Sequence, residues 1–142
     1  MFPVMFQKDA SRYAVQVRTE LCKNLPVVVA DHVQLQQVLM NLMTNGIEAM
    51  QEDGGELCVK SSVTEDGQLL VSVSDTGTGL PAGKDNEIFD AFFTTKSHGT
   101  GLGLAITRSI VESQSGRLWA TANQGRGATF QFTLPAKKAA HA

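Results

Sequence analysis

The chain has 142 residues, 42% of them hydrophobic and 18% charged, which is enough for one globular domain with a sizeable core and too hydrophobic for a disordered chain. Twelve lysines and arginines against 14 aspartates and glutamates give a net charge of −2, and this lack of a basic surplus argues against nucleic acid as a partner. No apolar run reaches the ~18 residues of a membrane span, and the first residues lack signal-peptide features. Two cysteines, Cys22 and Cys58, are too few for a disulfide framework or a zinc cluster, so we expect a cytoplasmic domain in which both are buried.

The first half of the chain predicts two helices and two short strands. In chain order the patterns indicate a short helix over 4–14, strands over 15–21 and 27–29, and a long helix over 32–51. Asp31 stands where the long helix would begin, and Gln34 follows three residues later, which is the spacing of a capping box. This long helix has the strongest helical pattern in the chain.

The second half predicts four strands, one helix and a long glycine-rich connection. The patterns indicate an antiparallel hairpin of strands 56–63 and 68–74, a connection over 75–99, a helix over 100–115 stopped by Gly116, strands over 117–122 and 128–134, and a flexible tail over 136–142. A connection of this length inside a compact domain is usually a functional loop or lid. Helices alternate with mostly antiparallel strand pairs, so the predicted class is α+β, with one sheet and its helices on one face.

The long helix predicts a polar stripe along one side. At 100° per residue, an arc of roughly 80° contains Gln37, Asn41, Asn45 and Glu48. The arc expected to face the sheet contains Leu35, Val38, Leu39, Leu42, Gly46, Ala49 and Met50, and beyond the polar stripe lie Met40, Met43 and Ile47. Amides bordered on both sides by apolar side chains favour the wall of a pocket, and an asparagine oxygen is a suitable ligand for Mg²⁺. The alternative is a pair of amides that cap or bridge local backbone.

Nine of the 13 glycines lie between Gly77 and Gly127. Asp75 directly follows a predicted strand and precedes Gly77 and Gly79. Its carboxylate can therefore accept a hydrogen bond from an exocyclic amine while the backbone passes close to a flat ring. An ordinary β-turn that begins with an aspartate is the alternative.

A second glycine cluster, Gly99–Leu104, opens the helix predicted over 100–115. Its alternating glycines and the helix N-terminus direct N–H groups toward one point, which favours an anion, most naturally phosphate. Lys96 and His98 lie just upstream and can contribute charge and hydrogen-bond donors, unless they are a solvated lysine and a loop histidine without a role. A P-loop and a dinucleotide-binding fingerprint are both excluded, because the residues that follow the relevant glycines do not match either motif.

Taken in order, these segments resemble the catalytic ATP-binding domain of bacterial sensor histidine kinases, within the superfamily of gyrase, Hsp90, histidine kinases and MutL. The N box resembles Gln36–Met50, the first glycine box Asp75–Gly79, the F box Ile88–Lys96, the second glycine box Gly99–Leu104 and the third Gly125–Phe130. Residues 45–50 and 92–96 are most similar to the nitrogen-regulation and oxygen-sensing branch. The resemblance implies a two-layer α/β sandwich of the Bergerat type, with a mixed, mostly antiparallel sheet, three helices on one face and an ATP lid.

The resemblance also implies a role for each matching residue. Asn45 would coordinate Mg²⁺ that bridges the ATP phosphates, with Asn41 close by. Asp75 would accept the adenine amino hydrogen bond, and Thr129 would support adenine recognition through its hydroxyl. Anchors for the lid would be Phe89, Phe92 and Phe93. The implied nucleotide-binding set is Asn45, Asp75, Gly77, Gly79, Leu80, Phe93, Lys96, His98, Gly99, Thr100, Gly101, Leu102, Gly103, Leu104 and Thr129, and the implied catalytic residues are Asn41, Asn45 and Lys96.

The resemblance favours phosphoryl transfer to a protein over ATP hydrolysis. Hydrolysing relatives place a glutamate one turn before the Mg²⁺ asparagine, and this chain has Asn41 there, whose amide cannot accept a proton at neutral pH. The implied acceptor is a histidine on a separate helical dimerisation domain, and a response regulator is an indirect partner. We therefore expect residues 1–135 to be the catalytic domain of a longer kinase whose dimerisation and sensor domains lie outside this chain. In isolation it would be a monomer without membrane contact.

Three other functions share parts of this pattern. An ATP-driven clamp or hydrolase of the same fold predicts steady phosphate release. A degenerate binding module predicts no thermal shift with ATP. A stand-alone serine kinase of the anti-sigma type predicts transfer to a partner that carries the acceptor serine.

Overall fold

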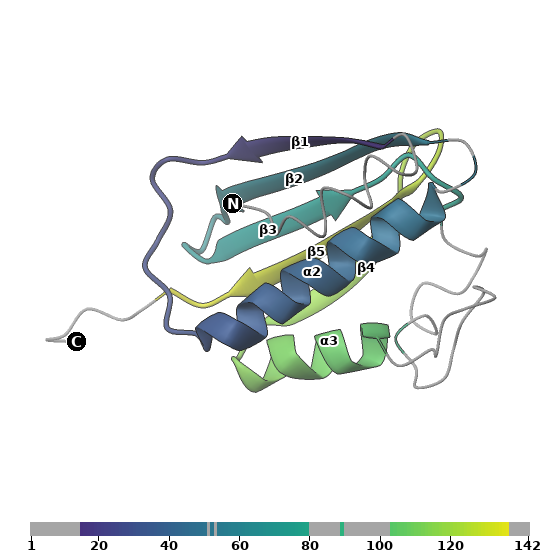
Figure 1. The fold of residues 1–142 in the computed structure, drawn as a ribbon. Coiled ribbons are helices and arrows are strands. Elements are labelled where there is room, and N and C mark those ends of the chain that lie inside the picture. Colours follow the sequence, from purple (N-terminus) through teal and green to yellow (C-terminus); the bar gives the residue numbers. More distant parts are fainter. Residues whose placement is uncertain (1–14, 51, 53, 80–88, 90–102, 137–142) are drawn as a thin grey trace, which may run out of the picture.

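The computed structural model describes residues 15–50, 52, 54–79, 89 and 103–136, which form five strands and two helices (Figure 1). In chain order these are β1 (Val15–Leu21), α2 (His32–Ala49), β2 (Gly55–Val63), β3 (Leu69–Ser74), α3 (Gly103–Ser113), β4 (Arg117–Ala122) and β5 (Ala128–Leu134). The bounds predicted for β1, β4 and β5 are confirmed, and those predicted for β2 and β3 each differ by one residue. The helix predicted over 4–14 lies outside the described residues.

The strands form one sheet in the order β1-β2-β3-β5-β4. Only the β1–β2 pair is parallel, and the other three pairs are antiparallel, including the predicted β2–β3 hairpin. Figure 1 shows α2 and α3 together on one face of this sheet. The predicted α+β class is therefore confirmed as a two-layer arrangement with a mixed, mostly antiparallel sheet.

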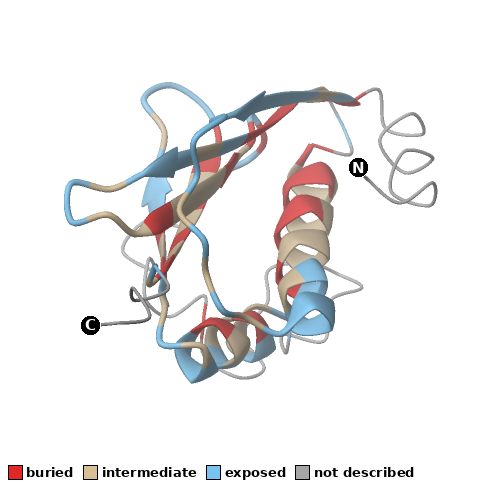
Figure 2. Cartoon of the chain, turned by 90° about the vertical axis from the view of Figure 1, so that its left-hand side faces the viewer, coloured by how far each residue is buried: buried red, intermediate tan, exposed pale blue. Residues whose placement is uncertain are grey.

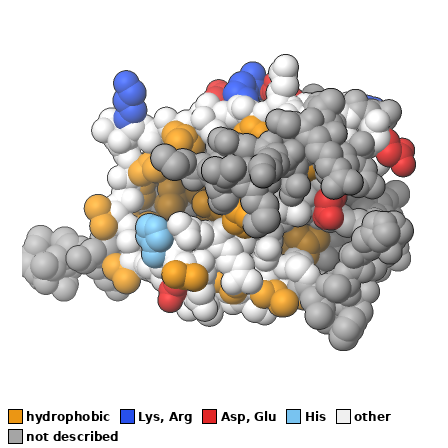
Figure 3. Space-filling view, viewed as in Figure 1, with side chains coloured by type: hydrophobic (Ala, Val, Ile, Leu, Met, Phe, Trp, Pro, Cys, Tyr) orange, Lys and Arg blue, Asp and Glu red, His pale blue; other side chains and the backbone are white. Residues whose placement is uncertain are grey.

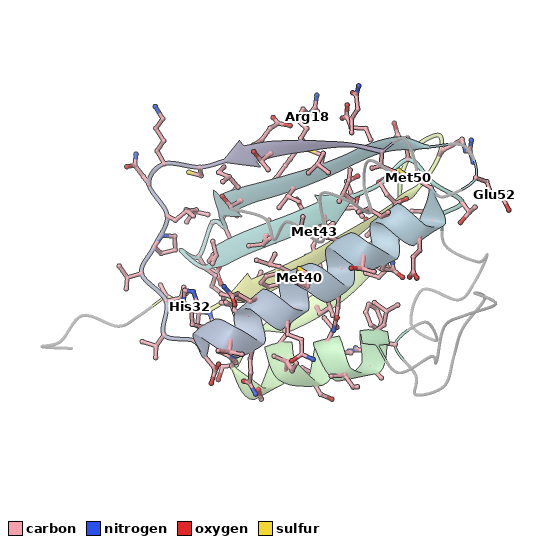
Figure 4. The ribbon with its side chains drawn as sticks, in the orientation of Figure 1. Arg18, His32, Met40, Met43, Met50 and Glu52 are labelled. Atoms are coloured by element: carbon pink, nitrogen blue, oxygen red, sulfur yellow. The ribbon has the colours of Figure 1, made fainter. Side chains whose placement is uncertain are left out.

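Helix α2 begins where the sequence predicted. Asp31 is its N-cap, and the Asp31 carboxylate accepts a hydrogen bond from the Gln34 backbone N–H at 3.0 Å. Met43 and Ile47, predicted to lie beyond the polar stripe, are almost fully buried in the core. They are buried because α2 is covered on two sides, by the sheet and by α3, so that its apolar arc is wider than one sheet-facing stripe. Figure 2 shows the buried residues along the inner side of α2, and Figure 4 labels Met43 there.

Two smaller predictions are corrected in the segment between β1 and α2. Val27–Val29 does not form a strand, because only Val28 pairs, in an isolated bridge with Ala136. Cys58 is buried as expected, but Cys22 is exposed, since it follows β1 and lies outside the ladder that encloses Cys58.

Several large apolar side chains are exposed, and most of them lie on this same segment and the start of α2. They include Leu21, Leu25, Val27, Val29 and Val33. In Figure 3 hydrophobic side chains lie close to the pale-blue histidine in this part of the surface. Neither described helix is long and apolar enough to span a membrane.

Candidate functional site

Asp75 is the buried carboxylate at the end of β3. Its side chain is 3% exposed, and its Oδ1 accepts hydrogen bonds from the backbone N–H groups of Gly77 at 2.9 Å and Ala128 at 3.3 Å. The Asp75 backbone N–H donates to the Ala128 carbonyl at 2.9 Å, which extends the β3–β5 ladder by one residue. Because a buried carboxylate needs such partners, these bonds fix the direction in which Asp75 points.

The loop after Asp75 packs directly on the C-terminal end of α2. A Cβ atom at Gly77 would lie 2.3 Å from the Ala49 carbonyl oxygen, so only glycine allows this approach. The next residue, Thr78, donates its backbone N–H to the same oxygen at 3.2 Å. The first glycine box thus joins β3 to α2, whereas the sequence had suggested that this glycine makes room for a base.

A third segment, the turn between β4 and β5, packs against the backbone of Asp75. Gly127 has φ +96°, and a Cβ there would lie 1.9 Å from the Asp75 carbonyl oxygen, so a side chain is excluded both by conformation and by space. In the same turn the Asn123 Nδ2 donates to the Asp75 carbonyl at 2.8 Å and to the Ser74 Oγ at 3.2 Å. The backbone of Asp75 is therefore held by the β4–β5 turn, through Asn123 and the close approach of Gly127.

The last turn of α2 lies against Asp75. A Cβ at Gly46 would lie 3.5 Å from the Asp75 Cβ, 3.8 Å from its Oδ2 and 2.6 Å from the Leu57 Cδ1. Glycine at this position lets the helix approach the end of β3. Asn45 directly precedes Gly46 on the same helix.

Helices α2 and α3 run antiparallel in a fixed register. The Asn41 Nδ2 donates to the Thr107 Oγ1 at 3.0 Å, and the Gln114 Nε2 donates to the Gln34 Oε1 at 3.1 Å. Seven residues separate these two contacts on both helices. Continuing by one further turn therefore brings Asn45 level with Gly103, the residue that begins α3 and is the last glycine of the second glycine box.

The described part of the F box is anchored in the core. Phe89 is buried and meets Phe130 of β5 edge to face, with ring centroids 6.1 Å apart. The Arg108 guanidinium of α3 lies 5.0 Å from the centre of the Phe89 ring, a favourable cation–π distance. The chain between Gly79 and Gly103 is thus fixed at this point to both the sheet and α3.

The described residues bring together part of the predicted site. Asn41 and Asn45 lie on α2, Asp75 and Gly77 contact the last turn of that helix, and Gly103 and Leu104 begin α3, whereas Gly79 lies against Gly127 of the β4–β5 turn. Outside the described residues are Leu80, Phe92, Phe93, Lys96, His98, Gly99, Thr100, Gly101 and Leu102.

Thr129 lies on a different side of the sheet from Asp75. The alternate residues Ala128 and Phe130 are buried beneath the helices, so Thr129 faces the opposite side of β5. There its hydroxyl hydrogen-bonds to Ser74 and Asn123. Thr129 therefore lies on the face of the sheet opposite to the helices, whereas Ala128 lies beside the Asp75 carboxylate.

Two residues of the site were not predicted from the sequence. Asn123 resembles any turn asparagine, although its position at the end of a strand that precedes a glycine turn is a weak signal for a side-chain-to-backbone bond. Thr107 stands in an apolar helical pattern, and a hydroxyl in such a pattern is the signal that was overlooked.

The charged groups on the outer face of the sheet are separate from this site. Arg18 forms ion pairs with Glu20 at 3.4 Å and Glu56 at 3.3 Å, and Glu20 also pairs with Lys60 at 3.5 Å. The hydrogen bond from the Cys58 thiol, followed by the charge of Lys60, lowers the pKa of Glu20. Figure 4 shows Arg18 on β1 at the edge of the sheet, away from α3.

The described residues of the site offer few metal ligands, which suits a cation that is bound mainly by the phosphates of a nucleotide. Among the residues that the structure describes, no cluster of three or more His, Cys, Asp or Glu side chains can hold a metal ion. The N box instead provides amide oxygens one turn apart, at Asn41 and Asn45. Mg²⁺ typically takes one or two protein oxygens and completes its shell with phosphates and water, so these residues fit Mg²⁺ that arrives with a nucleotide.

Residues 30–138 match the family described as Histidine kinase-, DNA gyrase B-, and HSP90-like ATPase. The chain is 49% identical over 123 residues to Sensor protein FixL of Bradyrhizobium diazoefficiens, a match that covers 86% of this chain and 24% of FixL. It is 37% identical over 132 residues to Sensor histidine kinase ZraS of Escherichia coli K12, covering 92% of this chain and 28% of ZraS. The chain therefore spans about a quarter of the length of these relatives.

Solved structures of histidine kinases have the same fold. The catalytic domain of histidine kinase ThkA is 34% identical with a TM-score of 0.81, covering 95% of this chain and 89% of that chain. Full-length ShkA in complex with AMPPNP is 28% identical with a TM-score of 0.81, covering 95% of this chain and 28% of that chain. The chain belongs to the family of histidine kinase-, DNA gyrase B- and HSP90-like ATPases, and within it is an ATP-binding catalytic domain of the sensor histidine kinase type.

Proposed function

We propose that this domain binds ATP with Mg²⁺ and supplies the γ-phosphoryl group to a histidine on a separate helical dimerisation domain. The observation that carries the proposal is the convergence on α2 of three segments far apart in sequence. The end of β3 with Asp75 contacts the helix at Gly46, the loop at Gly77 packs on its C-terminal end, and the start of α3 lies level with Asn45.

The base and the phosphates would bind at opposite sides of this convergence. The Asp75 carboxylate, held by two backbone N–H groups, is suited to accept a hydrogen bond from the exocyclic amine of adenine. Gly103 and Leu104 begin a helix whose N-terminal N–H groups and positive dipole end favour a phosphate. Lys96, His98 and residues 99–102 are proposed as further phosphate ligands, and Leu80 and Phe93 as contacts of the bound nucleotide.

Asn45 would hold the metal, with Asn41 beside it. Bound Mg²⁺ supplies neutralisation of phosphate charge during transfer. The chain's own contribution is to position the nucleotide. It does not offer a general base that would activate water at this position, because Asn41 presents an amide where a hydrolase needs a carboxylate. This favours transfer to a protein side chain over hydrolysis.

The domain would act as one part of a longer cytoplasmic kinase. Residues 1–135 would form the catalytic domain and 136–142 a tail, with a response regulator downstream of the phosphorylated histidine. The named relatives are about four times longer than the matched region, which supports an acceptor on another domain.

Calorimetry with ADP, in the presence and absence of Mg²⁺, tests the assignment of Asp75 to the adenine base and of Asn45 to Mg²⁺. Asp75→Asn should weaken metal-free ADP binding about 10-fold or more, because it removes a hydrogen bond to a charged acceptor. Asn45→Ala should remove mainly the Mg²⁺-dependent part of the affinity. Asp66→Asn, in the exposed β2–β3 turn, is the matched control and should bind like wild type. Equal effects of Asp75→Asn and Asn45→Ala with and without metal would contradict the assignment.

A further inference from the structure

Thr107 is a buried polar side chain at the interface of the two helices. Among the described residues, Asp75 and Thr107 are the buried ones with polar or charged side chains, and Thr107 has no exposed surface. It belongs to α3 and contacts α2 through Asn41. A buried hydroxyl costs stability unless both its donor and its acceptor capacity are used, so its hydrogen bonds are informative.

The geometry around Thr107 determines which way the Asn41 amide is turned. The Thr107 Oγ1 lies 2.6 Å from the Gly103 carbonyl oxygen, and a carbonyl can only accept, so the single hydroxyl proton is directed there. The amide atom that faces Oγ1 at 3.0 Å must then be the donor, Nδ2. The Asn41 oxygen is consequently the amide atom that is not bonded to Thr107.

We propose that Thr107 is a positioning residue that holds the Asn41 amide with its oxygen, and not its NH₂ group, presented to the Mg²⁺–phosphate side of the site. The inference rests on the proposed function. Mg²⁺ and its water shell are bound through oxygen acceptors, and an amide with free rotation presents NH₂ part of the time. The Thr107–Gly103 bond also ties this orientation to the first residue of α3, which is the last glycine of the second glycine box.

The test compares Thr107→Val, Thr107→Ser, Asn41→Ala and the double variant Asn41→Ala/Thr107→Val. Calorimetry measures the affinity of each for ADP with and without Mg²⁺, and thermal unfolding measures stability. Valine keeps the shape of threonine and removes the hydroxyl, whereas serine keeps the hydroxyl. We expect Thr107→Val to weaken Mg²⁺-dependent binding about 3- to 10-fold, the value of one hydrogen bond, without a lower melting temperature. Thr107→Ser should stay within about 2-fold of wild type.

The double variant separates positioning from packing. If Thr107 acts through Asn41, Thr107→Val should have no further effect in the Asn41→Ala background. The inference is overturned if Thr107→Val binds like wild type, if it weakens ADP equally with and without Mg²⁺, or if its effect persists without Asn41. Should Thr107→Val not fold, Thr107→Ala takes its place in the same comparison. A wild-type chain without any Mg²⁺-dependent nucleotide binding would instead refute the proposed function itself.

Discussion

Asn123, which was not singled out from the sequence, links the β4–β5 turn to the end of β3. Its Nδ2 donates to the carbonyl of Asp75 and to Ser74, and its Oδ1 accepts from the Thr129 hydroxyl. The bonds to Ser74 and Thr129 lie on the face of the sheet opposite to the helices. A half-buried amide that bridges three partners fixes a backbone segment more firmly than one hydrogen bond would.

Asn123→Ala should lower the free energy of unfolding by about 1–3 kcal/mol, because buried polar partners lose their hydrogen bonds. It should also weaken metal-free ADP binding, since the Asp75 carbonyl is no longer held. Urea unfolding and calorimetry measure the two effects. Gln124→Ala, at the exposed neighbouring position, is the control, and a loss below about 0.5 kcal/mol for Asn123→Ala would contradict this role.

Asp66 in the β2–β3 turn gives a pH prediction. The hydrogen bond from the Thr64 hydroxyl lowers the pKa of the Asp66 carboxyl, so folding favours its charged form. The resulting contribution to stability is present above the unfolded-state pKa of about 3.9 and is lost as the pH falls through the lower folded-state value. An NMR titration should place the Asp66 pKa below that of an unstructured aspartate, and Thr64→Val should raise it. An Asp66 pKa unchanged by Thr64→Val would refute this cause.

At the scale of the elements, three of the described glycines mark where segments meet. Gly46 lets α2 approach β3, Gly77 lets the next loop approach the end of α2, and Gly127 lets the β4–β5 turn approach Asp75. The sequence drew attention to Gly77 as a contact of a ligand. In the folded domain all three are contacts between parts of the protein, and they hold the end of β3 in place.

Gly77→Ala should destabilise the domain by about 1–3 kcal/mol, the usual range for overpacking, because the added Cβ would lie 2.3 Å from the Ala49 backbone oxygen. Gly103→Ala is the matched control, since no atom lies within 4 Å of the added Cβ. It should be neutral or stabilising by up to about 1 kcal/mol through helix propensity. Thermal and urea unfolding compare the two. Equal stability of both variants would mean that the loop does not pack on α2 as described.

At the scale of the whole molecule, the domain provides a nucleotide site, and the proposed phosphoryl acceptor lies elsewhere. Of the three histidines, His32 is exposed at the start of α2, at the opposite end of that helix from Ala49, where Gly77 packs. His98 and His141 lie outside the described residues. In the proposed reaction the acceptor histidine belongs to a second domain, which approaches the site.

We expect the 142-residue chain to bind ATP with Mg²⁺ and not to phosphorylate itself. Incubation with γ-labelled ATP, followed by measurement of acid-labile phosphate, should give no stoichiometric label on this chain. A histidine-bearing helical acceptor domain supplied as a separate polypeptide should become labelled. Stoichiometric label on this chain alone would refute the division of labour proposed here.

Local patterns in the sequence determined most of the elements. The strands β1, β4 and β5, the hairpin of β2 and β3, and the Asp31 cap of α2 were all predictable from propensity, periodicity and cap spacing, which are local features of the sequence. Val27–Val29 has the composition of a strand but lacks a partner along its length, and a strand exists only where a ladder can form. The family resemblance in turn singled out Asp75 and Asn45 because their motifs are short and local.

Only the tertiary structure decided how these residues are held. The burial of Met43 and Ile47 depends on α3 covering a second side of α2, and the orientation of the Asn41 amide depends on a threonine 66 positions away. The hydrogen bond from Asn123 to the Asp75 carbonyl, and the position of Thr129 on the side of the sheet away from the helices, depend on which strands become neighbours. Such contacts join residues far apart in sequence, and their partners are set by packing, on which a local pattern carries no information.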